Sequence, residues 1–269
     1  MIKRIAIHSV PRSGSSWLGQ IFNSSPQVNF KFQPLFSYAF KDALNLNSTK
    51  NEIVSFFEQI ASSEDDFLNC KSFIKSGKYP KFSKLKEYTS IVYKEVRYHH
   101  LLKNLMMNDD ELLVIGLIRN PKGVINSWLQ APREFKKGLE WDEDEEWLRA
   151  PKKNLNKQEE FNGFLKWVEC LRIFEYLNKN YPNRFIQIHY DDLLENTEDL
   201  VHHIFDRCEI PWNDQTENFI NNSRAKEVED AYSVFKKRKV DDVWKDELDN
   251  SIVDYIDSFL TKNSLEKFI

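Results

Sequence analysis

Short apolar runs alternate with segments of helical periodicity along most of the chain. Runs rich in β-branched residues predict buried strands at 5–10, 90–96, 112–118 and 184–190. Apolar residues spaced three and four apart predict helices at 51–60, 99–107, 121–129, 158–180, 198–208, 215–222 and 246–261. Strands separated by helices pair in parallel through crossovers. We therefore predict a single α/β domain over residues 1–269, with a central, mostly parallel sheet and helices on both faces.

Three segments do not follow this alternation. Residues 30–36 are rich in aromatic side chains and predict an extended segment, whereas the polar residues 62–89 predict loop with short helix. Residues 130–157 contain two prolines and an acidic run at 142–146. We interpret 130–157 as an insertion or lid over the site, and the acidic run within it as a solvated face.

Composition and charge argue against several classes of partner. The net charge of −4 and the pI of about 5.9 give no overall basis for binding nucleic acid or an anionic membrane. No apolar stretch approaches the roughly 18 residues that a membrane span needs. Three widely separated cysteines without CxxC spacing predict free thiols, not a disulfide framework or a zinc site. We expect a cytoplasmic protein, and the oligomeric state stays open.

The first predicted strand leads through a turn of small residues into a helix. Pro11 to Gly14 form the turn, and Ser15 and Ser16 stand where the helix N-terminus would be capped. Amides and the helix dipole at such a terminus favour an anion, and Arg12 adds a cation with several donors. The arrangement is P-loop-like but lacks the GxxxxGK pattern, because its cation precedes the glycine. An ordinary strand–turn–helix start with an exposed arginine is the alternative.

A second candidate anion site follows the third predicted strand. Arg119 ends that strand, and Ser127 lies eight residues later, about two turns into a helix that Pro121 begins. The two could hold a phosphate, although a salt-bridged arginine and a surface serine explain them equally well. Ligands of parallel α/β sheets lie beyond the carboxyl ends of the strands. Arg12, Arg119 and Tyr190 follow such ends, and Lys94 and Glu95 lie at the end of the second predicted strand. We therefore expect these residues to share one site.

These two elements resemble parts of the sulfotransferases that use 3′-phosphoadenosine 5′-phosphosulfate (PAPS). The string Arg12-Ser-Gly-Ser-Ser-Trp17 resembles the loop that binds the 5′-phosphosulfate in that family. Residues 117–127 resemble the element in which an arginine and a serine eight residues later hold the 3′-phosphate. Two matches in the right order are more specific than either one alone.

Two weaker matches lie in the C-terminal half. Residues 189–193 resemble a strand end whose tyrosine lines the adenine pocket, with Trp17 stacking on the adenine face. Residues 237–245 resemble an Arg-Lys-Gly…Trp-Lys segment, with Val240 in place of the glycine; a solvated basic run is the alternative there. The resemblance implies the following nucleotide-binding residues: Arg12, Ser13, Gly14, Ser15, Ser16, Trp17, Arg119, Ser127, Tyr190, Arg238 and Lys239.

The resemblance also implies a reaction. A sulfuryl group would move from PAPS, the co-substrate, to a hydroxyl or amine of a small-molecule or carbohydrate acceptor by in-line displacement, without a metal. Arg12 would neutralise charge on the leaving phosphate oxygen. For the base that takes the acceptor proton, Glu95 is the first candidate and His99 the second. A salt bridge to Lys94 or Arg97 explains Glu95 equally well.

Two other functions stay open at this point. A P-loop nucleotide kinase or NTPase would share the strand–loop–helix start, but the chain lacks GxxxxGK and a clear strand ending in a magnesium-binding aspartate. A non-catalytic relative could have kept the nucleotide site and lost the base. The identity of the acceptor cannot be predicted from these residues.

Overall fold

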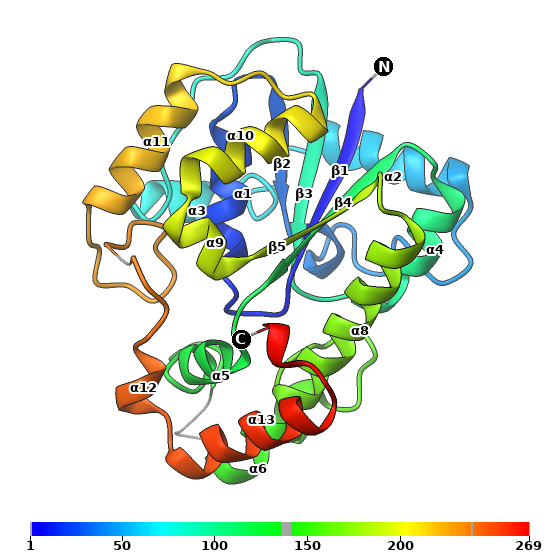
Figure 1. Ribbon diagram of the computed structural model, residues 1–269. Coiled ribbons are helices and arrows are strands. Elements are labelled where there is room, and N and C mark those ends of the chain that lie inside the picture. Colours follow the sequence, from blue (N-terminus) through cyan, green and yellow to red (C-terminus); the bar gives the residue numbers. More distant parts are fainter. Residues whose placement is uncertain (1, 136–140, 238, 269) are drawn as a thin grey trace.

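The computed structural model describes residues 2–135, 141–237 and 239–268. At its centre, five strands form a sheet in the order β2-β3-β1-β4-β5, with every neighbouring pair parallel (Figure 1). The strands are β1 (Lys3–His8), β2 (Val28–Phe32), β3 (Ser90–Glu95), β4 (Leu112–Ile118) and β5 (Phe185–His189). The predicted α/β fold is confirmed. The segment predicted only as extended overlaps the end of β2, an edge strand.

Helices cover both faces of this sheet (Figure 1). One face carries α1 (Ser15–Ser24), α9 (Tyr190–Glu195), α10 (Thr197–Cys208) and α11 (Asp214–Ala225). The other carries α2 (Lys50–Ser62), α4 (Leu102–Asn108), α8 (Phe164–Asn180) and α13 (Asn250–Lys262). Shorter or peripheral helices are α3 (Lys71–Lys75), α5 (Pro121–Leu129), α6 (Glu143–Arg149), α7 (Pro151–Asn154) and α12 (Trp244–Glu247), with 3-10 turns at Pro34–Phe36, His99–Leu101 and Glu266–Phe268.

One predicted helix begins later than its periodicity indicates. The sequence predicts a helix from residue 158, whereas α8 starts at Phe164. Gly163 precedes it with a φ of 85°, in the left-handed region that favours glycine. A Cβ at this position would lie 3.2 Å from the backbone nitrogen of Ala150. The close approach of two backbones therefore fixes the start of α8.

Alternation along the strands divides their side chains between two cores. In β1, Ile5 and Ile7 join the core beneath α1 and α10, whereas Ala6 joins the core on the opposite face. In β3, Val92 faces the α1 side and Tyr93 the opposite side. This parity matters at the carboxyl end of β3, because it separates the last two residues of the strand.

The segment 130–157 packs onto the second of these cores where it is described. Phe135, Trp147 and Ala150 are buried there. Most of the acidic run is exposed, as expected for a solvated face, but Glu146 is buried and accepts hydrogen bonds from the amides of Lys152 and Lys153 at 2.9 and 3.2 Å. This carboxylate therefore connects α6 to α7.

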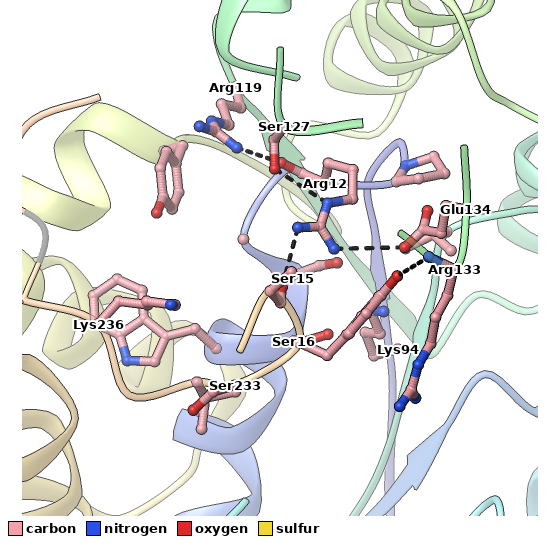
Figure 2. A pocket seen from close by; sticks show the side chains of 18 of the residues that line it. Arg12, Ser15, Ser16, Lys94, Arg119, Ser127, Arg133, Glu134, Ser233 and Lys236 are labelled. Carbon is pink, nitrogen blue, oxygen red and sulfur yellow. Dashed lines mark hydrogen bonds and ion pairs between the residues drawn. The ribbon is translucent and has the colours of Figure 1, made fainter. Parts of the chain in front are cut away.

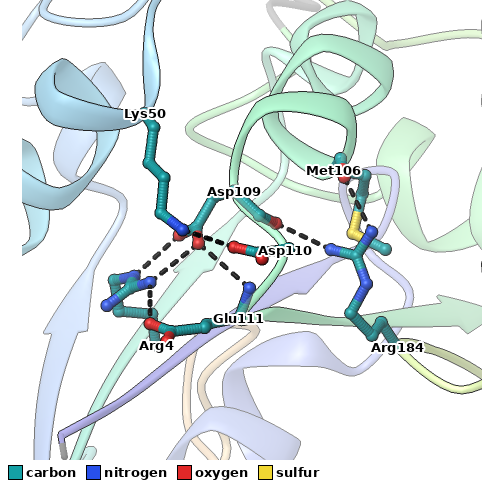
Figure 3. Close-up of polar contacts among 7 residues, drawn as sticks. All are labelled: Arg4, Lys50, Met106, Asp109, Asp110, Glu111 and Arg184. Atoms are coloured by element: carbon teal, nitrogen blue, oxygen red, sulfur yellow. Dashed lines mark hydrogen bonds and ion pairs between the residues drawn. The ribbon is translucent and has the colours of Figure 1, made fainter.

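A buried ion pair fastens the amino end of the sheet (Figure 3). Arg4 donates from Nε and Nη2 to the two carboxylate oxygens of Asp109, at 2.7 Å each, and Nη2 also contacts Glu111 at 2.8 Å. Arg184 donates to the carbonyl oxygens of Asp109 and Met106 at 2.7 and 2.9 Å. These contacts join the starts of β1, β4 and β5, at the end of the sheet opposite the strand termini that carry the predicted site.

The three cysteines and the helices can be compared with the predictions of free thiols and of no membrane span. Cys70, Cys170 and Cys208 are free and buried, and burial raises the pKa of each thiol. Among the helices described, none is both long and apolar enough to cross a membrane.

Candidate active site

The loop between β1 and α1 forms an open helix N-terminus. Arg12 and Gly14 have φ values of 69° and 85°, so the chain turns sharply before α1 begins at Ser15. No side chain caps this terminus, and the first amides of a helix have no intrahelical partner. The Ser13 hydroxyl is buried and makes no hydrogen bond within the described residues. The loop thus offers donors that an anion could satisfy.

Gly14 is required by contact as well as by conformation. A Cβ at this position would lie 2.4 Å from Cε2 of Tyr190, which is a steric clash. Tyr190 is the first residue of α9 and lies against the loop. The strand end at 189–193 and the N-terminal loop, predicted to share one site, are therefore in contact.

A cavity of about 600 Å³ opens at the carboxyl end of the sheet. Of the residues predicted to bind nucleotide, eight line it: Arg12, Gly14, Ser15, Ser16, Trp17, Arg119, Ser127 and Tyr190. Ser13 is buried behind the loop, and Lys239 is exposed and not part of the lining. Arg238 lies outside the described residues. The structure therefore brings together the loop, the β4–α5 element and the strand end after β5.

Arg12 lies at the centre of this cavity (Figure 2). Its Nε donates to the Ser127 hydroxyl at 3.1 Å, its Nη1 lies 3.5 Å from Glu134, and its Nη2 donates to the carbonyl oxygen of Ala231 at 3.0 Å. The guanidinium carbon is 5.4 Å from the centre of the Tyr232 ring. Figure 2 shows Lys94, Arg133 and Glu134 on one side of Arg12, and Ser233 and Lys236 on the other.

Arg119 is held firmly at the end of β4. Its Nε and Nη2 donate to the two carboxylate oxygens of Asp241, at 2.6 and 2.5 Å, and its Nη1 donates to the carbonyl oxygen of Arg12 at 2.6 Å. The guanidinium carbon lies 5.0 Å from the centre of the Tyr190 ring. The contact with the Arg12 carbonyl joins the two predicted phosphate-binding elements directly.

Trp17 and Tyr190 both supply aromatic surface to the cavity. The Trp17 indole Nε1 donates to the hydroxyl of Ser223 on α11 at 2.9 Å, which fixes the ring plane. Tyr190 lies across Gly14, as described above. Two rings in the cavity that contains the anion-binding loop suit a ligand that combines phosphate with an aromatic base.

Strand parity separates Lys94 from Glu95. Lys94 lies on the α1 side, 97% buried, with its Nζ 4.7 Å from the centre of the Phe32 ring, and it lines the cavity. Burial lowers its pKa, against the attraction of Glu95 and Glu134. Lys94 is therefore a cavity cation to which the sequence assigned no role. Lys94 and Glu95 point to opposite faces of β3, so the sequence would have indicated Lys94 rather than Glu95 only if the face that lines the cavity were known.

Glu95 and His99, the predicted bases, do not line the cavity. Glu95 is fully buried, accepts a hydrogen bond from the amide of Val96 at 3.0 Å, and has its pKa raised by burial. His99 is also fully buried; its Nδ1 lies 2.9 Å from Nδ1 of His8. Its ring centre lies 4.4 Å from that of Phe161. In this geometry, the two side chains belong to the protein interior.

The wall beyond Lys94 is aromatic. Phe73 stacks on Tyr79 with ring centres 4.7 Å apart, and Phe32 contacts both. Arg97 lies over the Phe36 ring at 4.0 Å and is held by Glu160 at 3.0 Å. The cavity is lined by Phe32, Phe36, Phe67, Phe73 and Tyr79 on this side. This end of the cavity therefore offers flat apolar surface with a cation at its edge.

The charge of the cavity is opposite to that of the chain. Its described lining contains eight cationic side chains, at Arg12, Lys94, Arg97, Arg119, Arg133, Lys153, Arg224 and Lys236, against two carboxylates, at Glu134 and Glu247. Glu247 accepts a hydrogen bond from Asn126 at 2.7 Å, on the α5 side. A local basic site in an acidic protein points to an anionic ligand. Over the described part of the chain, no cluster of three or more His, Cys, Asp or Glu side chains could hold a metal ion.

Comparisons with known proteins identify the family and the fold. The family model for the sulfotransferase domain matches residues 3–268. Mouse sulfotransferase SULT7A1, solved in complex with PAP, superposes with a TM-score of 0.57 at 13% identity, over 99% of this chain and 89% of that one. A sulfotransferase domain from the curacin biosynthetic pathway superposes with a TM-score of 0.52 at 17% identity, over 97% and 98%.

A third similar structure is retinol dehydratase in complex with androsterone and inactive cofactor PAP. It superposes with a TM-score of 0.52 at 13% identity, over 98% of this chain and 81% of that one. A sequence search of curated proteins found no significant match. The family model covers nearly every residue from the first strand to the last helical turn, so the chain belongs to the sulfotransferase family.

Proposed function

We propose that this sulfotransferase takes its sulfuryl group from PAPS and transfers it to a hydroxyl on an apolar, ring-containing small molecule. The observation that supports it best is the direct junction of the two anion-binding elements: the Arg12 carbonyl accepts from Arg119, and the Arg12 guanidinium donates to Ser127. A ligand with two phosphate-type groups on one nucleoside matches this junction. Two structures of the same fold were solved with PAP.

The residues present fit such a donor. The open α1 terminus, with Ser15 and Ser16 in the cavity lining, can donate hydrogen bonds to the 5′-phosphosulfate. Arg119 and Ser127 would hold the 3′-phosphate, and Trp17 and Tyr190 would contact the adenine. PAPS brings the activated sulfuryl group, and the protein contributes position and charge.

In the proposed transfer, one bond to sulfur forms while another breaks, and cations in the cavity stabilise the leaving group. The acceptor oxygen forms a bond to sulfur while the bond from sulfur to the 5′-phosphate oxygen breaks, and the leaving bisphosphate keeps the electron pair. Arg12 and Lys94 both line the cavity, with Lys94 to one side of Arg12 (Figure 2), and they can neutralise the charge that develops on that oxygen. Arg12 and Lys94 supply this charge as side chains, so the step assigns no metal ligand among the residues named here.

Glu134 is the group that we propose as base for the acceptor proton. Of the two carboxylates in the described lining, Glu247 is held by Asn126 on α5, whereas Glu134 stands beside Arg12 and on the same side as Lys94 (Figure 2). A base must reach the oxygen that attacks sulfur, and the contact of Glu134 with Arg12 supports this assignment. Glu134 belongs to the segment 130–157, which also contributes Arg133 and Lys153 to the wall; this supports a lid role for that segment.

The aromatic wall supports an apolar acceptor over a carbohydrate. Phe32, Phe36, Phe73 and Tyr79 present rings and few hydrogen-bonding groups, and recognition of a sugar needs many such groups. Arg97, at the edge of this wall, could donate hydrogen bonds to a polar or anionic substituent of the acceptor molecule.

The test is a transfer assay with radiolabelled PAPS over panels of phenols, apolar alcohols, sugars and amines. Sulfation of ring-containing hydroxyl compounds above the other panels supports the proposal. Calorimetry with adenosine 3′,5′-bisphosphate and with ATP plus Mg²⁺ checks the donor separately. Micromolar binding of ATP with no binding of the bisphosphate would contradict it.

A further inference from the structure

The most informative group that the proposed reaction does not use is the carboxylate of Asp241. Asp241 belongs to the segment between α11 and α12, and its side chain is 99% buried against Arg119. The Nε and Nη2 donors of Arg119 point at its two oxygens at 2.6 and 2.5 Å. Paired donors in this fork are the geometry with which arginine also binds phosphate.

The carboxylate lies over Gly123, where we expect a phosphate shared by Arg119 and Ser127. Gly123 and Ser127 are four residues apart on one face of α5, and Arg119 precedes the same helix. A phosphate held by both Arg119 and Ser127 must therefore lie over Gly123. A Cβ at residue 123 would lie 2.5 Å from Oδ2 of Asp241 and 3.0 Å from Nε of Arg119. The Asp241–Arg119 contact thus occupies the surface over Gly123.

The first turn of α5 makes this location favourable for any anion. The helix has nine residues, Pro121 to Leu129, and its N-terminal dipole favours negative charge over its first turn. Trp244 Nε1 donates to the carbonyl oxygen of Asp241 at 2.9 Å, which fixes the backbone beside the site. The Arg119 fork holds the carboxylate, and the nearby helix terminus favours its negative charge.

We propose that Asp241 is an internal substitute for the nucleotide 3′-phosphate, which the nucleotide must displace in order to bind. This inference rests on the proposed function, because it takes the 3′-phosphate to be held by Arg119 and Ser127. A carboxylate and a phosphate cannot share one fork over Gly123, since their charges repel and the same donors would serve both. Binding therefore exchanges one anion for the other.

The exchange has a consequence for selectivity. A nucleotide without a 3′-phosphate leaves the Asp241–Arg119 pair intact, whereas one with a 3′-phosphate must break it and release Asp241 towards solvent. Asp241 thus lowers the affinity for the 3′-phosphorylated nucleotide and couples its binding to a movement of the segment that precedes α12.

The variant Asp241→Asn tests this, with Asp242→Asn as the matched control. Asp242 is exposed and adjacent, so both variants change the net charge equally. Calorimetric titrations with adenosine 3′,5′-bisphosphate and adenosine 5′-monophosphate should show bisphosphate binding at least tenfold tighter in Asp241→Asn. The monophosphate affinity of that variant and both affinities of Asp242→Asn should stay within twofold of the unmodified protein. Weaker or unchanged bisphosphate binding in Asp241→Asn overturns the proposal, as does equal tightening for both nucleotides.

A second measurement does not depend on the folding of a variant. A crystal structure of the unmodified protein with the bisphosphate should place the Asp241 carboxylate out of contact with Arg119 and a phosphate in its place. An intact Asp241–Arg119 pair with the nucleotide bound overturns the inference while leaving the donor assignment in place. Conversely, bisphosphate binding without any sulfuryl transfer contradicts the proposed function, and the titrations still decide the role of Asp241.

Discussion

Arg12 and Ser127 are separated by 115 residues and meet in the cavity, where Arg12 Nε donates to the serine hydroxyl at 3.1 Å. The serine belongs to the element expected at the 3′-phosphate, and the arginine to the loop expected at the 5′-phosphosulfate. Arg12 also approaches Glu134, on the other side of the cavity. Its guanidinium therefore lies where the nucleotide end and the acceptor end of the cavity meet.

Arg12→Ala should reduce turnover more than nucleotide affinity. Charge on the leaving oxygen develops in the transition state, so loss of the cation should lower kcat by about 10² to 10³-fold. The loop amides and Arg119 remain, so the affinity for the bisphosphate should fall by less than about tenfold. Steady-state kinetics and calorimetry measure the two effects. The matched control is Arg133→Ala, which should act mainly on the KM of the acceptor; unchanged kcat in Arg12→Ala would falsify the assignment.

Arg119→Lys should weaken binding of the 3′-phosphate selectively. Lysine keeps the positive charge, so Asp241 is not left as an unpaired buried carboxylate. Lysine lacks the planar guanidinium, however, so it cannot bind the phosphate through two parallel hydrogen bonds. We expect the affinity for adenosine 3′,5′-bisphosphate to fall by about tenfold. The affinity for the 5′-monophosphate should change little. Equal losses for both nucleotides would place Arg119 outside the 3′-phosphate site.

The sequence predicted which of these residues meet in one cavity, because they follow strand ends. Arg12, Arg119 and Tyr190 are adjacent in the chain to apolar runs that can be recognised, and a parallel sheet brings their ends together. The fold could be predicted for the same reason. The edge strand β2 was harder, because its run is short and interrupted by polar residues.

Sequence reasoning assigned no role in the site to Lys94, Glu134 or Asp241, because their roles depend on information that local patterns lack. Lys94 and Glu95 are neighbours in a strand, and only knowledge of the site face decides which one enters the cavity. Glu134 lies in a segment without periodicity. Asp241 meets Arg119 across 122 residues, with no local signal to connect them.

The pH dependence of turnover should report on Lys94. Because burial lowers the pKa of this ammonium group, it loses its proton at a lower pH than an ordinary lysine. If its charge stabilises the transition state, kcat should fall as pH rises through this lowered pKa. In Lys94→Arg, where the charge persists, the alkaline decrease should disappear. The control is Lys31→Arg, at a buried lysine outside the cavity lining, which should keep the alkaline decrease in kcat. If the unmodified protein shows no alkaline decrease in kcat, the charge of Lys94 does not stabilise the transition state.

Glu134→Gln should lower kcat with little change in nucleotide affinity. Glutamine keeps the shape of the side chain but cannot accept the acceptor proton, and loss of a general base costs about 10² to 10⁴-fold. Glu95→Gln and His99→Gln are the comparison variants, because both residues lie in the interior. They should retain most of the turnover per folded molecule. A large loss in either of them, with Glu134→Gln active, would return the role of base to the residues first predicted.

Stability in acid should depend on the buried pair His8 and His99. Burial lowers the pKa of His8 to about 3, and the charge of nearby Lys94 acts in the same direction; burial, together with His8 and His100, lowers the pKa of His99 well below its usual value. The unfolded chain, with histidine pKa values near 6.5, binds more protons than the native state below that pH. The contribution of the two neutral histidines to the free energy of unfolding is therefore fully present above about pH 6.5. Below that pH it decreases by roughly 1.4 kcal/mol per pH unit for each histidine.

This predicts a loss of about 2 kcal/mol per histidine between pH 6.5 and pH 5. Urea denaturation at pH 7 and pH 5 measures it. His99→Gln should show a smaller difference between the two pH values, even if it is less stable at both, because one of the titrating groups is gone. His203→Gln is the matched control, since His203 is exposed on α10 and should leave the difference unchanged. If His99→Gln and His203→Gln lose the same stability on acidification, the buried pair does not determine the acid sensitivity of this fold.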